Sequence, residues 1–200
     1  MFPLGTVLLP GGVLPLHVFE PRYRALVADC LAGEPEFGVV LIDRGHEVGG
    51  GDVRRDVATV ARIVEVAQFT DGRSALVTVG TRRIRVEHWL DDDPYPRAEV
   101  TDWPDAIEGA DAEGPTLEDL LARLRRVLAL QTELGEPTPP VDSEVSDDPV
   151  LATYHACALA PLGPDDQYRL LSAAGPAQRR ILLEELLVGA EEVFRYRLSP

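Results

Sequence analysis

The chain has 200 residues, of which 45% are hydrophobic and 26% are charged, a composition typical of a soluble globular protein with one large or two small domains. Its formal net charge of −15 is poorly suited to neutralising phosphates, so we expect no nucleic-acid partner. The sequence has neither a transmembrane-length apolar run nor a basic segment leading into one, so we expect no membrane partner and a cytoplasmic location.

All 19 basic residues are arginine. The absence of lysine excludes a P-loop lysine, a Schiff-base lysine and a Ser–Lys catalytic dyad. The amino-acid composition therefore already removes several classes of enzyme.

One amphipathic helix is predicted near the N-terminus. Pro21 fits its first position, where the missing N–H needs no partner, and Gly33 can adopt the left-handed conformation that ends a helix. Between them, apolar side chains recur at helical spacing: Tyr23, Leu26, Val27, Cys30 and Leu31. We therefore expect this helix to pack one face against a core.

Apolar and β-branched runs predict strands around this helix. The predicted strands are Thr6–Leu9, Val13–Phe19, Phe37–Ile42, Val57–Phe69, a pair separated by Gly80, and Arg97–Thr101. Broken alternation around Val64 predicts a bulge, and Asp71-Gly72 predicts a two-residue hairpin turn. On the returning strand, Ala75, Val77 and Val79 share one face. These elements would form a meander of six or seven strands, which can close into a small barrel or a rolled sheet.

Beyond residue 108 the period of the apolar residues changes from two to 3.6. We therefore place a β-rich subdomain at residues 1–108 and a helical subdomain, a small bundle, at residues 109–200. Helix starts are predicted at Thr116, Asp148, Pro164 and Pro176 from their capping or proline signals. The predicted fold class is α+β.

The titratable residues do not form the pattern of a catalytic or metal site. His155 and Cys157 lie about 200° apart on a helix and cannot share a metal ion. Cys30 lies, like Cys157, on an apolar helix face, which favours free thiols over a disulfide. We expect His17 to be a structural histidine, and Glu20 to pair with neighbouring arginines or cap the helix. We therefore expect no catalytic residue, no metal and no cofactor.

The order of these segments resembles the amino-terminal substrate-binding (LON) domain of the ATP-dependent protease Lon. The resemblance is carried by Phe2-Pro3-Leu4, Leu8-Leu9-Pro10-Gly11, Leu14–Gly33, Phe37-Gly38-Val39-Val40, Val60-Ala61-Arg62-Ile63, Asp71-Gly72-Arg73, Gly80-Thr81-Arg82-Arg83, Pro94-Tyr95-Pro96 and Asp165–Leu187. It implies that the β-rich half is a PUA-like pseudo-barrel around one amphipathic helix.

The resemblance implies binding rather than chemistry. Lon itself continues into an ATPase and a peptidase, whereas this chain has no G-x-x-x-x-G-K-[ST] motif and no lysine. We therefore expect a stand-alone, non-catalytic module that binds unfolded or extended polypeptide, as an adaptor in protein quality control with a protease or chaperone as partner. The alternative is a PUA-like sensor of a small ligand or, less favoured, of RNA. An unrecognised hydrolase is a third reading.

Binding would use the sheet surface. A rolled sheet with open edges can capture an extended segment as an added strand, and a cleft between sheet and helices could hold apolar side chains. The candidate peptide-binding residues are Phe19, Tyr23, Phe69, Trp89 and Trp103. The structural alternative for each of them is a place in the core.

Overall fold

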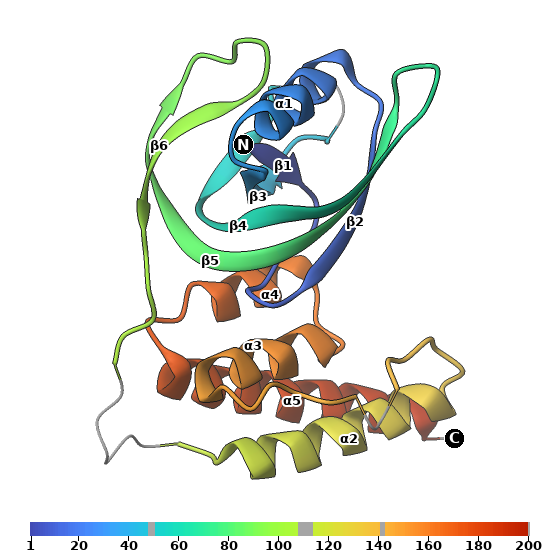
Figure 1. The fold of residues 1–200 in the computed structure, drawn as a ribbon. Helices are drawn as coiled ribbons and strands as arrows, with labels where there is room; N and C mark the ends of the chain where they lie inside the picture. Colours follow the sequence, from blue (N-terminus) through green and yellow to red (C-terminus); the bar gives the residue numbers. More distant parts are fainter. Residues whose placement is uncertain (48–50, 108–113, 141–142, 200) are drawn as a thin grey trace. The chain divides into compact units, whose positions relative to one another are not determined.

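A computed structural model of the chain describes residues 1–47, 51–107, 114–140 and 143–199 (Figure 1). It divides into two compact units, Met1–Pro104 and Asp105–Pro200. Within the described residues, the first unit holds six strands and one helix, and the second holds four helices, so the fold class is α+β. The domain boundary predicted at residue 108 lies outside the described residues.

The strands of the first unit form one mixed sheet. They are β1 (Phe2–Leu4), β2 (Val13–Val18), β3 (Glu36–Arg44), β4 (Val53–Gln68), β5 (Ser74–Leu90) and β6 (Arg97–Asp102). Their order is β1-β3-β4-β5-β2, and β6 pairs with the C-terminal half of β5. Among the described strands β1 and β2 end this order, so the sheet is open rather than a closed barrel.

The single helix of this unit, α1 (Pro21–Ala32), lies inside the curl of the sheet (Figure 1). Tyr23, Leu26 and Val27 are buried and join side chains from β1 to β5 in one core cluster. The ring of Tyr23 stacks on Phe2 with 4.1 Å between centroids. The predicted start at Pro21 and end at Gly33 are confirmed. The predicted left-handed conformation of Gly33 was wrong: its φ is −126°, and its N–H donates to the carbonyls of Asp29 and Cys30 at 3.2 and 3.3 Å.

Two strand predictions were wrong. The apolar segment Thr6–Leu9 is irregular, although Leu8 and Leu9 are 4% and 3% exposed, so its apolar residues reflect burial rather than a strand. Gly80 does not separate two strands, since β5 runs through it. A Cβ at Gly80 would collide with the carbonyl oxygen of Leu9, which explains the glycine as a close approach of two backbones.

The hairpin between β4 and β5 also differs from its prediction. The N–H of Phe69 donates to the carbonyl of Arg73 at 2.9 Å, and the N–H of Gly72 donates to the carbonyl of Phe69 at 2.9 Å. The loop therefore has three residues, with Gly72 in the left-handed region at φ 81°. The predicted bulge in β4 is confirmed by register shifts between Thr59 and Ala61 and between Ile63 and Glu65.

The second unit consists of α2 (Leu117–Glu133), α3 (Pro149–Leu159), α4 (Pro164–Leu171) and α5 (Pro176–Leu198). All four begin where the sequence predicts. Thr116 Oγ1 accepts a hydrogen bond from the Asp119 N–H, and the Asp148 carboxylate accepts one from the Leu151 N–H. Helix α3 contacts α2, α4 and α5, and α2 packs along α5. None of the described helices is long and apolar enough to cross a membrane.

A fully buried arginine lies among these helices, and sequence reasoning did not single it out. Arg179 of α5 is 0% exposed. Its guanidinium donates to Thr153 Oγ1 at 2.9 Å, to the Tyr154 hydroxyl at 2.7 Å and to the Leu170 carbonyl at 3.2 Å. It also forms an ion pair with Asp105. These partners compensate a charge that burial alone would disfavour.

Candidate functional site

The free end of the β4–β5 hairpin carries the candidate site. The register of β3 with β4 ends at Arg62, and the Ile63 N–H still donates to the Pro35 carbonyl at 2.7 Å. From Glu65 onward β4 is paired with β5, which pairs in turn with β2. The register of these three strands forms rows of neighbouring side chains. Successive rows along β5 are His17–Ala75–Ala67 and Pro15–Val77–Glu65.

The two faces of this three-stranded end differ in burial. Leu16, Val18 and Leu76 point into the core and are 9%, 1% and 2% exposed. The alternate residues point away from the core, because successive side chains of a strand lie on opposite faces. We call this second face the outer face and define it by Pro15, His17, Phe19, Glu65, Ala67, Phe69, Arg73, Ala75 and Val77.

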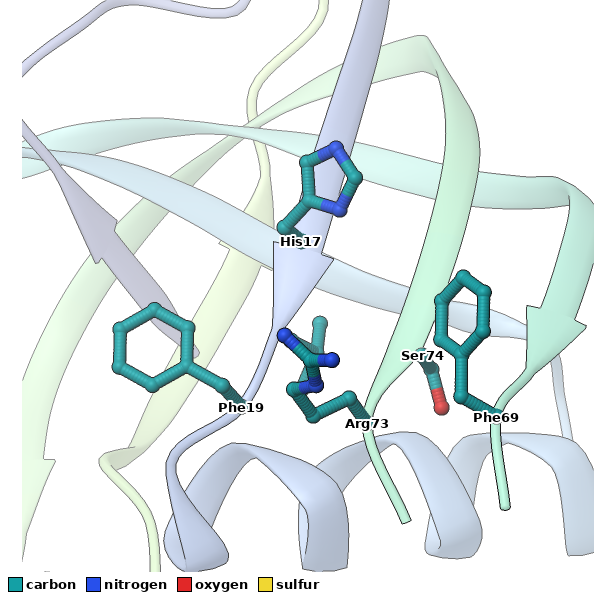
Figure 2. A pocket seen from close by; sticks show the side chains of 6 residues that line it. His17, Phe19, Phe69, Arg73 and Ser74 are labelled. Carbon is teal, nitrogen blue, oxygen red and sulfur yellow. The ribbon is translucent and has the colours of Figure 1, made fainter. Parts of the chain in front are cut away.

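The outer face is hollowed next to the hairpin loop. A pocket of about 290 Å³ is lined by His17, Val18, Phe19, Phe69, Arg73 and Ser74, and we call it the Phe19–Phe69 pocket. Figure 2 shows Phe19 at the end of β2 and Phe69 at the end of β4, with the Arg73 guanidinium between them. Phe19 and Phe69 are 54% and 48% exposed, so about half of each residue remains open to solvent as apolar surface.

A second hollow continues along the same face. It measures about 280 Å³, shares His17 with the Phe19–Phe69 pocket, and includes Ala67, Ala75 and Val77 among its lining residues. The small alanine side chains leave room above the sheet for the side chains of a ligand. The two hollows therefore follow one another along the outer face and meet at His17.

The charge at the pocket comes from the hairpin loop and β2. Arg73 Nε donates to Asp71 Oδ2 at 2.7 Å, and the Arg73 N–H donates to Asp71 Oδ1 at 3.0 Å. Both bonds lower the pKa of Asp71, the one from the Arg73 backbone N–H more than the one from the Arg73 side chain. The Arg73 side chain remains 64% exposed. Among the described lining residues of the pocket, Arg73 and His17 are the ionisable ones.

The structure brings together two of the five aromatic residues proposed from sequence, Phe19 and Phe69. Tyr23 is 3% exposed and belongs to the core, where burial raises the pKa of its hydroxyl to about 12. It lines a smaller hollow of about 180 Å³ on which Phe19 also borders. Phe19 therefore connects the outer face with the region where α1 begins.

The two tryptophans lie elsewhere in the first unit. Trp89, on β5, packs against a core cluster and lies under the Arg54 guanidinium, 4.7 Å from its ring centroid. Trp103, after β6, lies between Arg83 and Arg85 at 4.3 and 4.2 Å. Cation–π contacts therefore already use both rings.

His17 corrects an expectation. Instead of serving as a structural histidine, it is exposed and lines both hollows of the outer face. Its place follows from alternation in β2, where Leu16 and Val18 point inward. Glu20 behaves as expected, because it pairs with Arg22 at 3.1 Å.

The free edge of β2 is interrupted by a proline. The N–H of Gly80 donates to the Gly12 carbonyl at 2.9 Å. Because hydrogen-bonded positions alternate along an antiparallel strand, the backbone groups of Leu14, Leu16 and Val18 face β5. Pro15 therefore faces the open side, where it has no N–H to donate. This position weakens strand addition along β2.

In the part of the chain that the structure describes, no three or more His, Cys, Asp or Glu residues cluster in a way that could hold a metal ion. Cys30 and Cys157 are free thiols. Burial raises the pKa of Cys157 to about 12.

Comparisons with known proteins agree with this architecture. Residues 1–189 match the family described as the ATP-dependent protease La (LON) substrate-binding domain. The Lon protease of Anaeromyxobacter dehalogenans is 29% identical over 95% of this chain, and Lon protease 2 of Sorangium cellulosum is 31% identical over 96%. The chain spans about a quarter of the length of these two relatives, 23% and 24% respectively.

Solved structures give the same assignment. The crystal structure of a Lon N-terminal domain protein from Xanthomonas campestris superposes with a TM-score of 0.63 at 31% identity, covering 94% of this chain and 95% of that one. The N-terminal domain of a Lon protease of the Mycobacterium avium complex has a TM-score of 0.59 at 20% identity, covering 95% and 96%, and supports the fold alone. The chain belongs to the LON substrate-binding domain family.

Proposed function

We propose that this chain is a non-catalytic substrate-binding module that recognises unfolded or extended polypeptide on the outer face. The observation that carries the proposal is the pair of half-exposed rings, Phe19 and Phe69, at one pocket. Membership of a family described as substrate-binding supports it. Interruption of the β2 edge by Pro15 favours a segment lying across the face over one added as a strand.

The apolar surface implies weak binding. Fully burying a phenylalanine contributes about 1.5–3 kcal/mol, so covering the remaining half of Phe19 and Phe69 contributes about 2 kcal/mol in total. Ordering an extended segment costs part of that gain. This gain is small beside the roughly 8 kcal/mol of a micromolar complex, so we expect weak binding, which suits an adaptor that releases its clients. We propose accordingly a cytoplasmic role in protein quality control, with a protease or chaperone as the second partner.

The test measures, by fluorescence anisotropy, the binding of a permanently unfolded protein such as reduced and carboxymethylated α-lactalbumin. We expect Phe19→Ala and Phe69→Ala each to weaken binding about threefold to tenfold, because each removes apolar contact area worth about 1 kcal/mol. The matched control is Tyr196→Ala, since Tyr196 is an aromatic residue of the other unit and is 82% exposed. Absence of binding, or equal loss in all three variants, would overturn the proposal.

A second candidate is a sensor of a small ligand in a PUA-like pseudo-barrel. It is favoured by a hollow of about 420 Å³ whose lining includes Phe37, Gly38, Leu90 and Tyr95. This volume lies within the range of small-molecule sites, about 300–1,000 Å³. A thermal-shift screen with nucleotides and metabolites tests this reading, and a shift abolished by Gly38→Val would support it. RNA is disfavoured by the net charge of −15.

A further inference from the structure

Resting on the proposed function, we propose that the outer face selects extended segments in which an acidic side chain lies two residues from an apolar one. The carboxylate would pair with Arg73, and the apolar side chain would lie over Ala67 and Ala75. The occupant is thus a polypeptide segment with an internal Asp or Glu and a large aliphatic or aromatic residue on the same side.

The first support is the position of Arg73. Its Nε is held by Asp71, which fixes the guanidinium beside the pocket. The side chain is 64% exposed and lies between Phe19 and Phe69 (Figure 2). A guanidinium presents several donors in one plane and binds a carboxylate in a bidentate manner. The neighbouring rings would partly shield that contact from water.

The second support is charge complementarity. The chain carries 34 acidic residues against 19 arginines, yet the ionisable side chains among the described residues lining this pocket are Arg73 and His17. A guanidinium at the pocket favours an anionic group over a cationic one there. Asp71 moderates this charge but lies on the loop and not among the lining residues.

The third support is the spacing along β5. Arg73, directly before β5, and then Ala75 and Val77 on β5 follow one another at intervals of two residues, or about 6.6 Å. Side chains of an extended ligand that face the sheet repeat at the same interval. An acidic residue over Arg73 therefore places the residue two positions along over the alanines.

Glu65 gives the face a direction. It opposes Val77 in the row beyond the alanines and lines the second hollow. A second acidic residue four positions from the first would meet this carboxylate, so it should weaken binding. An uncharged or basic residue is expected there.

The experiment uses the full chain and acetylated, amidated nonapeptides with a central leucine. Three peptides differ at the residue two positions before the leucine, which is glutamate, glutamine or lysine. We expect the glutamate peptide to bind about fivefold more tightly than the glutamine peptide in low salt, since a partly shielded ion pair contributes about 1 kcal/mol. The preference should shrink as salt is added.

Four variants of the protein test the assignment. Arg73→Gln should abolish the preference and Arg73→Lys should keep part of it, whereas Asp71→Asn should increase it by removing the competing carboxylate charge. Arg44→Gln is the matched control, because Arg44 is an 81% exposed arginine beside an aspartate, outside the outer face. A preference that survives Arg73→Gln would overturn the inference.

The outcomes separate this inference from the proposed function. Equal binding of the glutamate and glutamine peptides, with loss in Phe69→Ala, would refute the acidic preference while leaving polypeptide binding intact. No binding of any peptide or of the unfolded protein would refute both. A preference that appears only when the peptide ends in a free carboxylate would point to chain termini and would also overturn the inference.

Discussion

The buried ion pair between Arg179 and Asp105 gives the most quantitative prediction. In the Asp105→Asn variant, the guanidinium keeps its bonds to Thr153, Tyr154 and Leu170 but loses its counter-charge. Removing one partner of a buried pair costs about 3–5 kcal/mol. Because the Asp105 side chain is 14% exposed, we expect the lower end, a loss of about 3 kcal/mol in the free energy of unfolding.

The hydroxyl of Tyr154 bridges the same pair. It accepts from Arg179 at 2.7 Å and donates to Asp105 at 2.9 Å. Hydrogen bonds to charged groups contribute about 1.5–3 kcal/mol, so Tyr154→Phe should cost about 2 kcal/mol. In the Arg179→Met background, Asp105→Asn should lower the free energy of unfolding far less than it does in the wild type, because no buried guanidinium remains to be compensated.

Urea unfolding followed by far-ultraviolet circular dichroism measures these changes, since it reports on helices α2 to α5. Glu136→Gln is the control, because Glu136 pairs with Arg197 at 2.6 Å in the same unit, with side chains 35% and 45% exposed. We expect that control to cost less than about 1 kcal/mol. A loss from Asp105→Asn as small as that of the control would refute the reasoning.

Three further predictions concern the core. Burial raises the pKa of Tyr23 to about 12, so the unfolded state loses this proton at lower pH than the native state does. The contribution of Tyr23 to the free energy of unfolding should therefore fall by up to about 2–3 kcal/mol between pH 10 and 12. Urea titrations at several pH values should show a smaller fall in Tyr23→Phe. Cys157 is fully buried and its pKa is raised to about 12, so in the native protein it should not react with a thiol reagent near neutral pH. Cys30→Ser should therefore abolish labelling of the native protein, measured by mass spectrometry. Gly80→Ala should destabilise the first unit by about 2 kcal/mol or more, because the added Cβ meets the Leu9 carbonyl; an unchanged urea midpoint would contradict this.

Local signals in the sequence predicted the helices well. Pro21, Thr116, Asp148 and Pro164 mark helix starts because capping depends on neighbouring backbone groups alone. The strand pattern around Gly80 failed for the opposite reason. Its glycine is required by the approach of Leu9, a contact between segments distant in sequence that periodicity does not encode.

The candidate site was predicted in part. Phe19 and Phe69 were proposed as binding residues and share one pocket, whereas Tyr23 lies in the core. Arg73 and His17 were not proposed as binding residues. Alternation in β2 points His17 outward, but its neighbours on the outer face depend on the bulge after Ile63, which sets Glu65 opposite Val77.

The buried arginine of α5 was invisible to sequence reasoning for a simple reason. A charged residue on a helix is normally solvated, and nothing adjacent to Arg179 indicates otherwise. Its partners Asp105 and Tyr154 are 74 and 25 residues away along the chain. Only the packed structure brings them together.

The most direct test of polypeptide binding on the outer face is hydrogen exchange of the full chain, with and without unfolded α-lactalbumin. We predict protection confined to the segments that form this face, at residues 13–19 and 65–77, and reduced protection there in Phe69→Ala. Protection confined to the 420 Å³ hollow around Phe37 and Tyr95, or to α2–α5, would contradict the account.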